Sequence, residues 1–285
     1  MGRGALGLEL TMSPRAEPAI LFRDLTLGYD RHPAVHHIKG EVAQGALLAV
    51  IGPNGAGKST LFKGIMGELR PLGGSFALGG IARRDIAYLP QVADIDRSFP
   101  ISVFDCVSMG LWREIGAWRG LGRGGRAKVS RALDAVGMSE LAGRSIGSLS
   151  GGQFQRVLFA RLLLQDARLI LLDEPFRAVD ANTVADLVGL IKAWQREGRT
   201  VLAALHDLEQ VKAHFPETLL LAREVVAWGE TRKVLTEDNL AKARELLAVF
   251  DDHAGVCVRE GPASPHEEVH ARASAGEPAR EREPA

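Results

Sequence analysis

The sequence predicts an α/β protein with a largely parallel sheet, and three observations carry that prediction. Short apolar runs alternate with helical patterns between residues 18 and 250, which is the order that strand–helix–strand units produce. The runs are apolar throughout, as strands are when helices cover both faces of a parallel sheet. Glycine is abundant, with 32 among 285 residues, and without a fixed period this excess favours loops with close backbone approach.

Composition and charge exclude several other classes of protein. The 35 basic residues balance 35 acidic ones, so the basic footprint typical of nucleic-acid-binding proteins is missing and we expect no nucleic acid among the partners. The two cysteines, Cys106 and Cys257, exclude a disulfide framework or a cysteine-rich zinc site and favour a reducing compartment. No uncharged apolar run reaches the ~18–20 residues of a membrane span, and the first residues lack a signal-peptide core. We therefore expect a cytoplasmic protein.

The apolar runs indicate where the strands of one domain, residues 18–250, lie. Outside that range, residues 1–17 and 251–285 contain too few apolar side chains to offset the entropy of ordering. We expect a loose N-terminal segment and a disordered C-terminal tail. The candidate buried strands are Leu47–Ile51, Ile86–Leu89, Leu169–Leu172, Val201–Leu205 and Thr218–Leu221.

A glycine-punctuated helical segment, about residues 92–149, interrupts this alternation. In one of its helical stretches, Val129, Leu133 and Val136 fall on a single face. Gly137 follows them and suits a C-cap. The segment therefore predicts an α-helical subdomain inserted into the α/β core.

The strongest motif is the glycine-rich loop Gly52–Thr60, GPNGAGKST, which matches the phosphate-loop pattern G-x-x-x-x-G-K-[ST] in full. Backbone N–H groups of such a loop converge on phosphate oxygens, Lys58 reaches the β- and γ-phosphates, and Ser59 offers a hydroxyl to Mg²⁺. The alternative is an ordinary glycine turn, which the apolar run Leu47–Ile51 before it and the helical run Leu61–Leu69 after it disfavour. The predicted phosphate-binding residues are Gly52, Pro53, Asn54, Gly55, Ala56, Gly57, Lys58, Ser59 and Thr60.

Two adjacent carboxylates end another apolar run, Leu169–Glu174, LILLDE. Alternation along a strand points Asp173 and Glu174 in opposite directions, so they suit two different tasks. We expect Asp173 to reach the Mg²⁺ beside the phosphate loop, and Glu174 to polarise the water that attacks the phosphoryl group. Taken alone, the run fits equally well a strand that ends in a polar turn before Pro175.

A second candidate anion site is the string LSGGQ at Leu149–Gln153, which precedes a helical run. Ser150 stands in the N-cap position, and glycine amides at a helix start attract anions. A plain serine cap with a glycine turn is the alternative. The residues expected to bind here are Ser150, Gly151, Gly152 and Gln153.

Six motifs in one order resemble the ATP-binding subunits of ABC transporters over residues 18–245. The resemblance implies a P-loop NTPase (RecA-like) core with a mainly parallel sheet, an antiparallel β subdomain near the N-terminus and the inserted helical subdomain. The motifs are the Walker A loop Gly52–Thr60, YLPQ ending at Gln91, LSGGQ at Leu149–Gln153, a Walker B strand ending at Asp173–Glu174, a D-loop ending at Asp180, and His206 after the run VLAAL.

The resemblance also implies roles that spacing does not supply. Tyr29 resembles the aromatic residue that stacks on adenine, although a strand-edge tyrosine remains the alternative. Gln91 resembles the Q-loop residue, which touches Mg²⁺ or the lytic water, and His206 the switch histidine that holds the γ-phosphate and Glu174 in register. The implied cofactors are ATP and Mg²⁺, the latter held by Ser59, Gln91 and Asp173. The implied catalytic residues are Lys58, Gln91, Glu174 and His206.

Two subunits of this family pack head to tail, and this would explain why one chain has two anion sites. Each ATP then lies between the Walker loop of one copy and the LSGGQ of the other. Asp180 reaches across to align both sites. The implied partners are a second copy of the chain, multispanning permease subunits and, indirectly, a periplasmic or extracellular metal-binding protein. The chain would lie at the cytoplasmic face of the plasma membrane, with Phe99–Val107 beside the groove that receives a permease helix.

Within the family, Phe99–Trp112 and Glu174–Asp180 resemble the zinc/manganese uptake group. The sequence is therefore expected to encode the ATPase of a divalent metal importer, for zinc before manganese or iron. An importer for another cargo is the alternative. A soluble ABC ATPase acting on nucleic acid is a third possibility, which lacks support because the chain has one cassette and no coiled-coil insertion.

Three features stand apart from this pattern. Arg177 occupies a D-loop position that usually holds a small or hydroxyl residue. His32, His36 and His37 are interpreted as solvated surface histidines, since no cysteine or zinc-type spacing accompanies them. A basic stretch from Arg119 to Arg131 is interpreted as a solvated segment, with contact to anionic lipid or a permease loop as the alternative.

Overall fold

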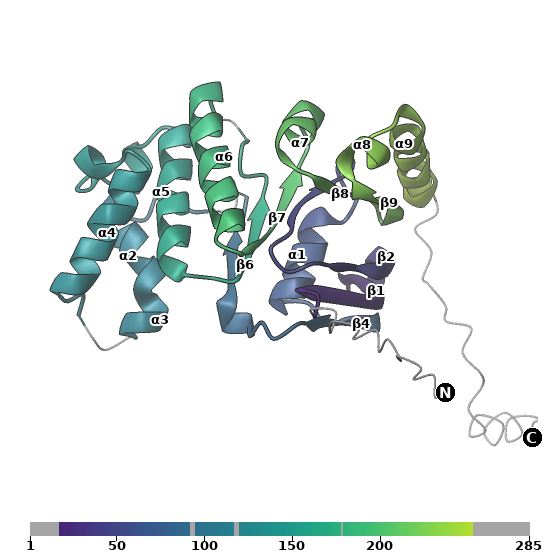
Figure 1. Cartoon of the computed structure of the whole chain (residues 1–285), viewed down its shortest axis with the longest axis horizontal. Coiled ribbons are helices and arrows are strands. Elements are labelled where there is room, and N and C mark those ends of the chain that lie inside the picture. Colours follow the sequence, from purple (N-terminus) through teal and green to yellow (C-terminus); the bar gives the residue numbers. More distant parts are fainter. Residues whose placement is uncertain (1–16, 92–94, 117–119, 178, 253–285) are drawn as a thin grey trace, which may run out of the picture. The chain divides into compact units, whose positions relative to one another are not determined.

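The computed structural model describes residues 17–91, 95–116, 120–177 and 179–252 (Figure 1). The loose segment expected at residues 1–17 and the tail expected at 251–285 lie almost wholly outside these residues. The last helix continues to Asp252, slightly beyond the expected start of the tail.

A six-stranded sheet forms the centre of the fold. Its strand order is β5-β6-β7-β3-β8-β9, and every neighbouring pair is parallel except β8 and β9. The predicted mainly parallel sheet is therefore confirmed, with each predicted strand in place. The strands are β3 (Leu47–Ile51), β5 (Ile86–Leu89), β6 (Leu169–Asp173), β7 (Thr200–Leu205), β8 (Glu217–Ala222) and β9 (Glu224–Glu230).

A smaller antiparallel sheet, with strand order β2-β1-β4, confirms the β subdomain near the N-terminus. Its strands are β1 (Ile20–Tyr29), β2 (His32–Val42) and β4 (Gly73–Leu78). Helix α1 (Lys58–Met66) packs against it so closely that a Cβ on Gly64 would lie 2.3 Å from Cδ1 of Leu27. The small sheet and the helix after the phosphate loop are thus tightly joined.

Helix α1 begins and ends earlier than the run Leu61–Leu69 predicts. Its first residue is Lys58, at the end of the phosphate loop, and it ends before Gly67. Gly67 has a φ of 83°, the left-handed conformation in which glycine ends a helix without a steric penalty. The glycine, rather than the apolar pattern, decides the end of the helix.

The inserted helical subdomain is confirmed as a set of helices between β5 and β6. The helix that carries Val129 and Leu133 ends at Ala135, Val136 is its C-cap, and Gly137 follows with a φ of 67°. All three apolar side chains are buried. The elements of this region are α2 (Val103–Ser108), η3 (Met109–Leu111), α3 (Trp112–Ile115), α4 (Arg123–Ala135), η4 (Ser139–Leu141), η5 (Ile146–Ser148) and α5 (Gly151–Gln165).

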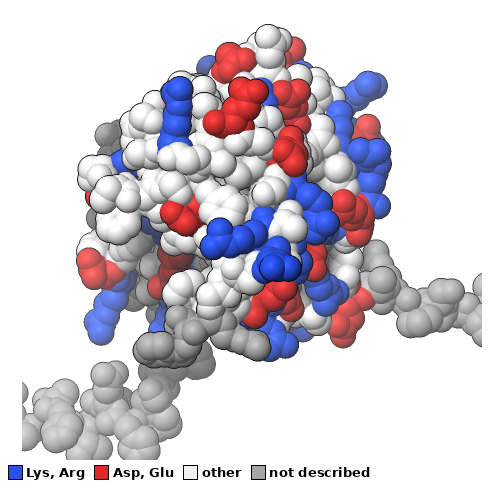
Figure 2. Space-filling model, turned by 90° about the vertical axis from the view of Figure 1, so that its left-hand side faces the viewer, with Lys and Arg blue, Asp and Glu red and all other residues white. Residues whose placement is uncertain are grey.

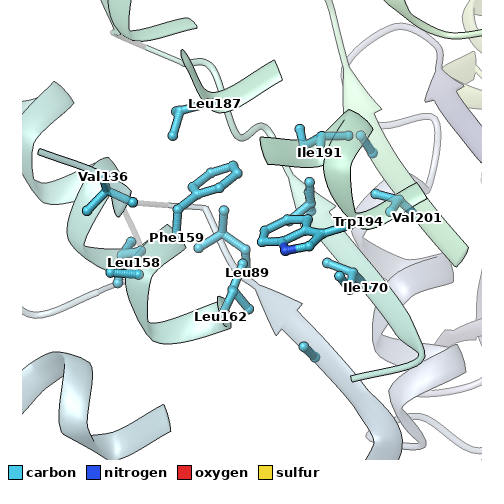
Figure 3. Close-up of a cluster of buried hydrophobic side chains, with 14 of the residues drawn as sticks. Leu89, Val136, Leu158, Phe159, Leu162, Ile170, Leu187, Ile191, Trp194 and Val201 are labelled. Atoms are coloured by element: carbon cyan, nitrogen blue, oxygen red, sulfur yellow. The ribbon is translucent and has the colours of Figure 1, made fainter. Parts of the chain in front are cut away.

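An aromatic stack joins the helical region to the central sheet. Phe159 of α5 and Trp194 of α6 (Ala181–Arg196) lie parallel, with ring centroids 5.7 Å apart, and both are buried. Figure 3 shows the two rings among Leu89, Ile170 and Val201, which come from three strands of the large sheet. Burial of such large side chains stabilises the fold by about 1.5–3 kcal/mol each. The stack therefore fixes α5 on the sheet.

The remaining elements are a short helix that precedes β5, a helix that follows β7 and two helices that follow β9. In the part of the chain that the structure describes, no helix has the length and apolar character to cross a membrane. The elements are η1 (Arg83–Asp85), α7 (Leu208–His214), α8 (Thr231–Val234) and α9 (Glu237–Asp252).

Candidate nucleotide-binding site

The phosphate loop connects β3 to α1 in a conformation that depends on its glycines. Gly55 and Gly57 have φ values of 81° and 94°, which L side chains rarely adopt. A Cβ on Gly57 would also lie 2.3 Å from Cγ2 of Val35 and 2.7 Å from the carbonyl oxygen of Ala34. The loop can therefore keep this shape only with glycine at position 57.

The side chain of Lys58 is buried against the phosphate loop to which it belongs. The side chain is 8% exposed, and its Nζ donates hydrogen bonds to the carbonyl oxygens of Gly52 at 2.9 Å and Pro53 at 3.1 Å. Burial lowers the pKa of Lys58, while the carboxylates of Glu174 and Asp173 oppose that shift. The ammonium group is thus held against carbonyl oxygens of its own loop, near the carboxylates of Asp173 and Glu174.

Backbone hydrogen bonds from distant segments brace the loop. The carbonyl oxygen of Ala56 accepts from the amide of Arg223 at 3.0 Å, and the carbonyl oxygen of Arg223 accepts from the amide of His36 at 2.7 Å. His36 is only 8% exposed, and burial lowers the pKa of its imidazole. The interpretation of His36 as a solvated surface histidine is therefore wrong, because β2 turns this side chain into the protein. His32 and His37 are exposed, and His37 pairs with Asp24.

Asp173 is a buried carboxylate with one oxygen left open. The residue is 2% exposed, and Tyr88 Oη donates to its Oδ2 at 3.3 Å. Burial raises the pKa of Asp173, and contacts from Ser59, Gln91 and Tyr88 oppose the shift. Within the described residues, Oδ1 accepts no hydrogen bond. A buried open carboxylate oxygen beside the Ser59 hydroxyl and the Gln91 amide fits the oxygen ligands that Mg²⁺ prefers.

Glu174 lies beyond the end of its strand, so the alternation used to predict its direction does not apply to it. Strand β6 ends at Asp173, and Glu174 has a φ of 50°, so a left-handed turn follows the strand directly. Its amide donates to the carbonyl oxygen of Ala204 at 3.1 Å, which ties the turn to β7. One Glu174 oxygen, Oε2, lies 2.9 Å from Nη1 of Arg177.

The parallel strands bring the motifs to one edge of the sheet. The phosphate loop, Gln91, the Asp173–Glu174 pair and His206 each follow the carboxyl end of a strand, where ligands of open α/β sheets bind. His206 lines one cavity with Gly52, Pro53 and Asn54, and a second, of about 220 Å³, with Glu174. Tyr29 ends β1 and is 46% exposed, free to meet a flat ring.

The Ser150 helix end is built as a capping box. Ser150 Oγ accepts from the amide of Gln153 at 3.2 Å, and Gln153 Oε1 accepts from the amide of Ser150 at 3.0 Å. Both residues are exposed. No hydrogen bond or ion pair among the described residues joins this cap to the phosphate loop. Figure 1 places α5 within the helical group, away from α1 beside the small sheet.

Asp180 caps the next helix. Its Oδ1 accepts from the amide of Thr183 at 3.0 Å, its Oδ2 accepts from the Thr183 hydroxyl at 2.7 Å, and these bonds lower the pKa of Asp180. Arg156 of α5 donates to the same Thr183 hydroxyl at 3.0 Å and to Asp186 at 2.8 Å. The LSGGQ helix and the helix after the D-loop are therefore tied together. Residue 178 of the D-loop lies outside the described residues.

Two polar residues of this site were missed from the sequence. Arg156 gives no signal in a single sequence, because its partners come from a separate helix. Tyr88 could have been found in YLPQ. It pairs in register with Leu171, and Asp173 lies two residues further along the same face of β6, close enough for a long side chain to reach.

A groove lies on the other side of Tyr88. It has a volume of about 840 Å³, and its lining includes Met66, Tyr88, Met109, Trp112 and Arg161. Met109 and Trp112 are 50% and 62% exposed, which is unusual for large apolar side chains. Met109 and Trp112 come just after Phe99–Val107, the segment expected beside a permease groove, and the rest of the lining comes largely from α1, β5 and α5.

The basic stretch is partly paired. Lys128 Nζ lies 2.5 Å from Oε2 of Glu114, and the other described basic residues of the stretch, Arg123, Arg126 and Arg131, are exposed. Arg119 lies outside the described residues. Figure 2 shows basic and acidic side chains interspersed on the face of the helical region, which favours the solvated interpretation.

The described residues contain no group of three or more His, Cys, Asp or Glu side chains placed to hold a metal ion together. The Asp173 site differs from such a cluster because a hydroxyl and an amide stand beside a single carboxylate.

Comparisons with known proteins agree with this geometry. A family model described as ABC transporter matches residues 35–177. The zinc transport system ATP-binding protein TroB of Treponema pallidum is 41% identical over 229 residues, which cover 79% of this chain and 86% of TroB. The manganese transport system ATP-binding protein MntB of Halalkalibacterium halodurans is 37% identical over 245 residues, which cover 85% of this chain and 98% of MntB.

Solved structures give the same picture. An inward-facing ABC transporter, described as of metal-chelate type, is similar with a TM-score of 0.71 and 33% identity over 80% of this chain and 90% of that chain. A nucleotide-free ATP-binding cassette of an ABC transporter has a TM-score of 0.70, and the match covers 80% of this chain and 99% of that chain. At 21% identity it supports the fold alone.

Proposed function

Because this chain belongs to the ABC transporter family and is one of its ATPases, we propose that it powers the uptake of a divalent metal ion, with zinc as the first candidate and manganese as the second. The similarity to zinc and manganese transport subunits along about four fifths of the chain supports the metal cargo. The open Asp173 oxygen beside the phosphate loop is the structural observation that carries the reaction.

The phosphate loop and Lys58 bind the triphosphate. Loop amides and the N-terminus of α1 supply donors and partial positive charge to phosphate oxygens. Lys58 exchanges its hydrogen bonds to the Gly52 and Pro53 carbonyls for the β- and γ-phosphates. Tyr29 stacks on the adenine ring from the exposed end of β1.

Asp173, Ser59 and Gln91 would hold the Mg²⁺ that accompanies ATP. When bound, Mg²⁺ would neutralise charge on the phosphate oxygens. Asp173 would contribute the open Oδ1, and Ser59 and Gln91 already lie close enough to favour its ionised form.

Glu174 and His206 act on that water. Glu174 accepts its proton as the water attacks the γ-phosphate, and His206 holds the phosphate beside the carboxylate. The donors on the far side come from Ser150–Gln153 of a second copy, because that cap is exposed and makes no contact with its own phosphate loop. ATP then favours the closed pair, and hydrolysis removes the preference.

The groove lined by Met109 and Trp112 docks a membrane-embedded permease subunit. Its exposed apolar side chains, and their place just after Phe99–Val107 in the chain, support this assignment. The chain works at the cytoplasmic face of the membrane, and a metal-binding protein outside the membrane delivers the ion to the permease.

The reaction is tested with Glu174→Gln, which keeps the side-chain shape and removes the base. We expect ATP binding to persist while kcat for hydrolysis falls by ~10²–10⁴-fold. Glu209→Gln, an exposed glutamate of α7, is the matched control and should hydrolyse ATP normally. Wild-type turnover by Glu174→Gln would remove Glu174 from this role.

The cargo is tested by complementation. A strain lacking the chain is supplied with the wild-type copy or with Glu174→Gln, and uptake of zinc, manganese and iron is measured separately. Restoration of zinc or manganese uptake by the wild-type copy alone supports the proposal. Restoration of transport for a non-metal solute, without any metal, would contradict it.

A further inference from the structure

The D-loop of this chain carries an arginine that lies directly on the proposed catalytic base. Arg177 Nη1 donates to Oε2 of Glu174 at 2.9 Å, and the amide of Arg177 donates to the carbonyl oxygen of Glu174 at 3.2 Å. We propose that Arg177 is a latch, a positioning residue that keeps the Glu174 carboxylate occupied in the resting subunit and must leave it before hydrolysis. This inference rests on the assignment of Glu174 as the base.

The two ends of the ion pair differ in exposure. The Glu174 side chain is 11% exposed and the Arg177 side chain 62%. The backbone of Glu174 is also held by its left-handed φ of 50° and by the hydrogen bond from its amide to the carbonyl oxygen of Ala204. Arg177 can therefore turn into solvent without disturbing buried packing, whereas the Glu174 carboxylate stays enclosed.

The pair hinders the chemistry that Glu174 performs. A carboxylate that accepts a proton from water needs a free lone pair aimed at that water. The guanidinium occupies one of the two oxygens through a charge-assisted hydrogen bond. Release of Arg177 frees that oxygen to accept a hydrogen bond from the attacking water.

The cavity next to the pair shows where the released carboxylate can act. Glu174, Arg177, His206 and Gln210 line this space of about 220 Å³. His206 shares its other cavity with the phosphate loop. A carboxylate released from Arg177 therefore stays beside the histidine expected to meet the γ-phosphate, while the guanidinium lies at the solvent side.

The purified full-length chain is tested with Arg177→Ala. We expect kcat for basal ATP hydrolysis to rise by about threefold to tenfold with KM unchanged, since exposed and charge-assisted ion pairs correspond to differences of that order. Arg177→Lys keeps a charge but loses the planar fork, so it should show a smaller rise. Arg196→Ala, an exposed arginine at the far end of α6, is the control and should leave kcat unchanged.

A double variant separates a latch from an indirect effect. Arg177→Ala combined with Glu174→Gln should hydrolyse ATP as slowly as Glu174→Gln alone, because no base remains to be freed. A fall in kcat for Arg177→Ala, no change, or an equal rise in the Glu174→Gln background would each overturn the latch. Full activity of Glu174→Gln would instead overturn the assignment of the base, so the two failures are distinguishable.

Discussion

Two helix N-termini of this chain are candidate anion sites, and they differ in burial and in the hydrogen bonds they already make. At the start of α1, Lys58 is buried and bound to its own loop, and a carboxylate with an open oxygen lies beside it. At the start of α5, Ser150 and Gln153 satisfy one another and stand exposed. The start of α1 has a carboxylate oxygen and a lysine ammonium group that a ligand can still bind. The start of α5 has its side-chain hydrogen bonds already satisfied and faces outward.

In the proposed mechanism this difference separates ATP binding from ATP hydrolysis. The α1 end would hold a nucleotide by itself, because its proposed donors and Mg²⁺ ligands come from one chain. The α5 end would gain a ligand only when a second copy presents one. Changes at the two ends should therefore separate ATP binding from ATP hydrolysis.

The largest effect is expected for Ser150→Asp. Aspartate caps a helix as well as serine does, so the fold should keep its stability, while a negative charge facing the γ-phosphate of the partner opposes closure. We expect hydrolysis to fall at least about 100-fold with ATP binding by the single subunit intact. Isothermal calorimetry and phosphate release measure the two quantities. Ser150→Asn, an equally good neutral cap, is the matched control and should lose far less activity.

Mixing two inactive variants sharpens this prediction. In a mixed pair of Ser150→Asp and Lys58→Ala, one site contains both changes and the other contains neither. We expect random mixing to restore about a quarter of wild-type hydrolysis if the sites work independently. An inactive mixture whose pairs still form would show that the two helix ends do not share a nucleotide.

A smaller effect is expected in stability, and only at the α1 end. Burial raises the folded-state pKa of Asp173 above the ordinary value of 3.8, so the folded chain holds that proton more tightly than the unfolded chain. The free energy of unfolding of the nucleotide-free protein should therefore fall as pH rises between those two pKa values. Asp173→Asn should remove this slope and raise the free energy of unfolding at neutral pH by about 1 kcal/mol.

Urea unfolding at several pH values measures this effect, and ATPase assays should show that Asp173→Asn is inactive. Ser150→Asn should leave the pH slope as in the wild type. An unchanged slope in Asp173→Asn would mean that ionisation of Asp173 does not lower the free energy of unfolding in the absence of nucleotide.

The smallest effect is expected for Tyr88→Phe, which removes one hydrogen bond to Asp173 and keeps the ring in the groove. Loss of a bond worth about 1 kcal/mol or less should raise the Mg²⁺ concentration for half-maximal hydrolysis by about twofold to threefold. A Mg²⁺ titration of ATPase activity measures it. Tyr29→Phe, which removes a hydroxyl from the proposed adenine contact, should leave the Mg²⁺ requirement unchanged.

Much of the fold was predictable because its signals are local. The buried strands are uninterrupted apolar runs, and Ser150 is a serine three residues before a glutamine at a helix start, which is the capping-box pattern. Gly57 also follows from local chemistry, since the loop needs a positive φ there. These features need no knowledge of distant partners.

The features that were predicted wrongly or missed depend on contacts between distant parts of the chain. His36 looks like its exposed neighbours in the sequence, and only the pairing of β2 with distant segments buries it. Strand alternation was the basis for predicting the direction of Glu174, yet Glu174 follows the end of β6 in a left-handed turn that is bonded to Ala204. The contact between Arg177 and Glu174 needs the shape of that turn, which a single sequence does not supply.

The bracing of the phosphate loop has a practical consequence for protein engineering. Its shape relies on Val35 and Ala34 beside Gly57, and on the chain of backbone hydrogen bonds from His36 through Arg223 to Ala56. Grafting the letters GPNGAGKST into another scaffold would leave those supports behind. A designed protein that includes the hairpin containing His36 and the bend at Arg223 should bind phosphate. The loop peptide alone should not adopt the binding conformation.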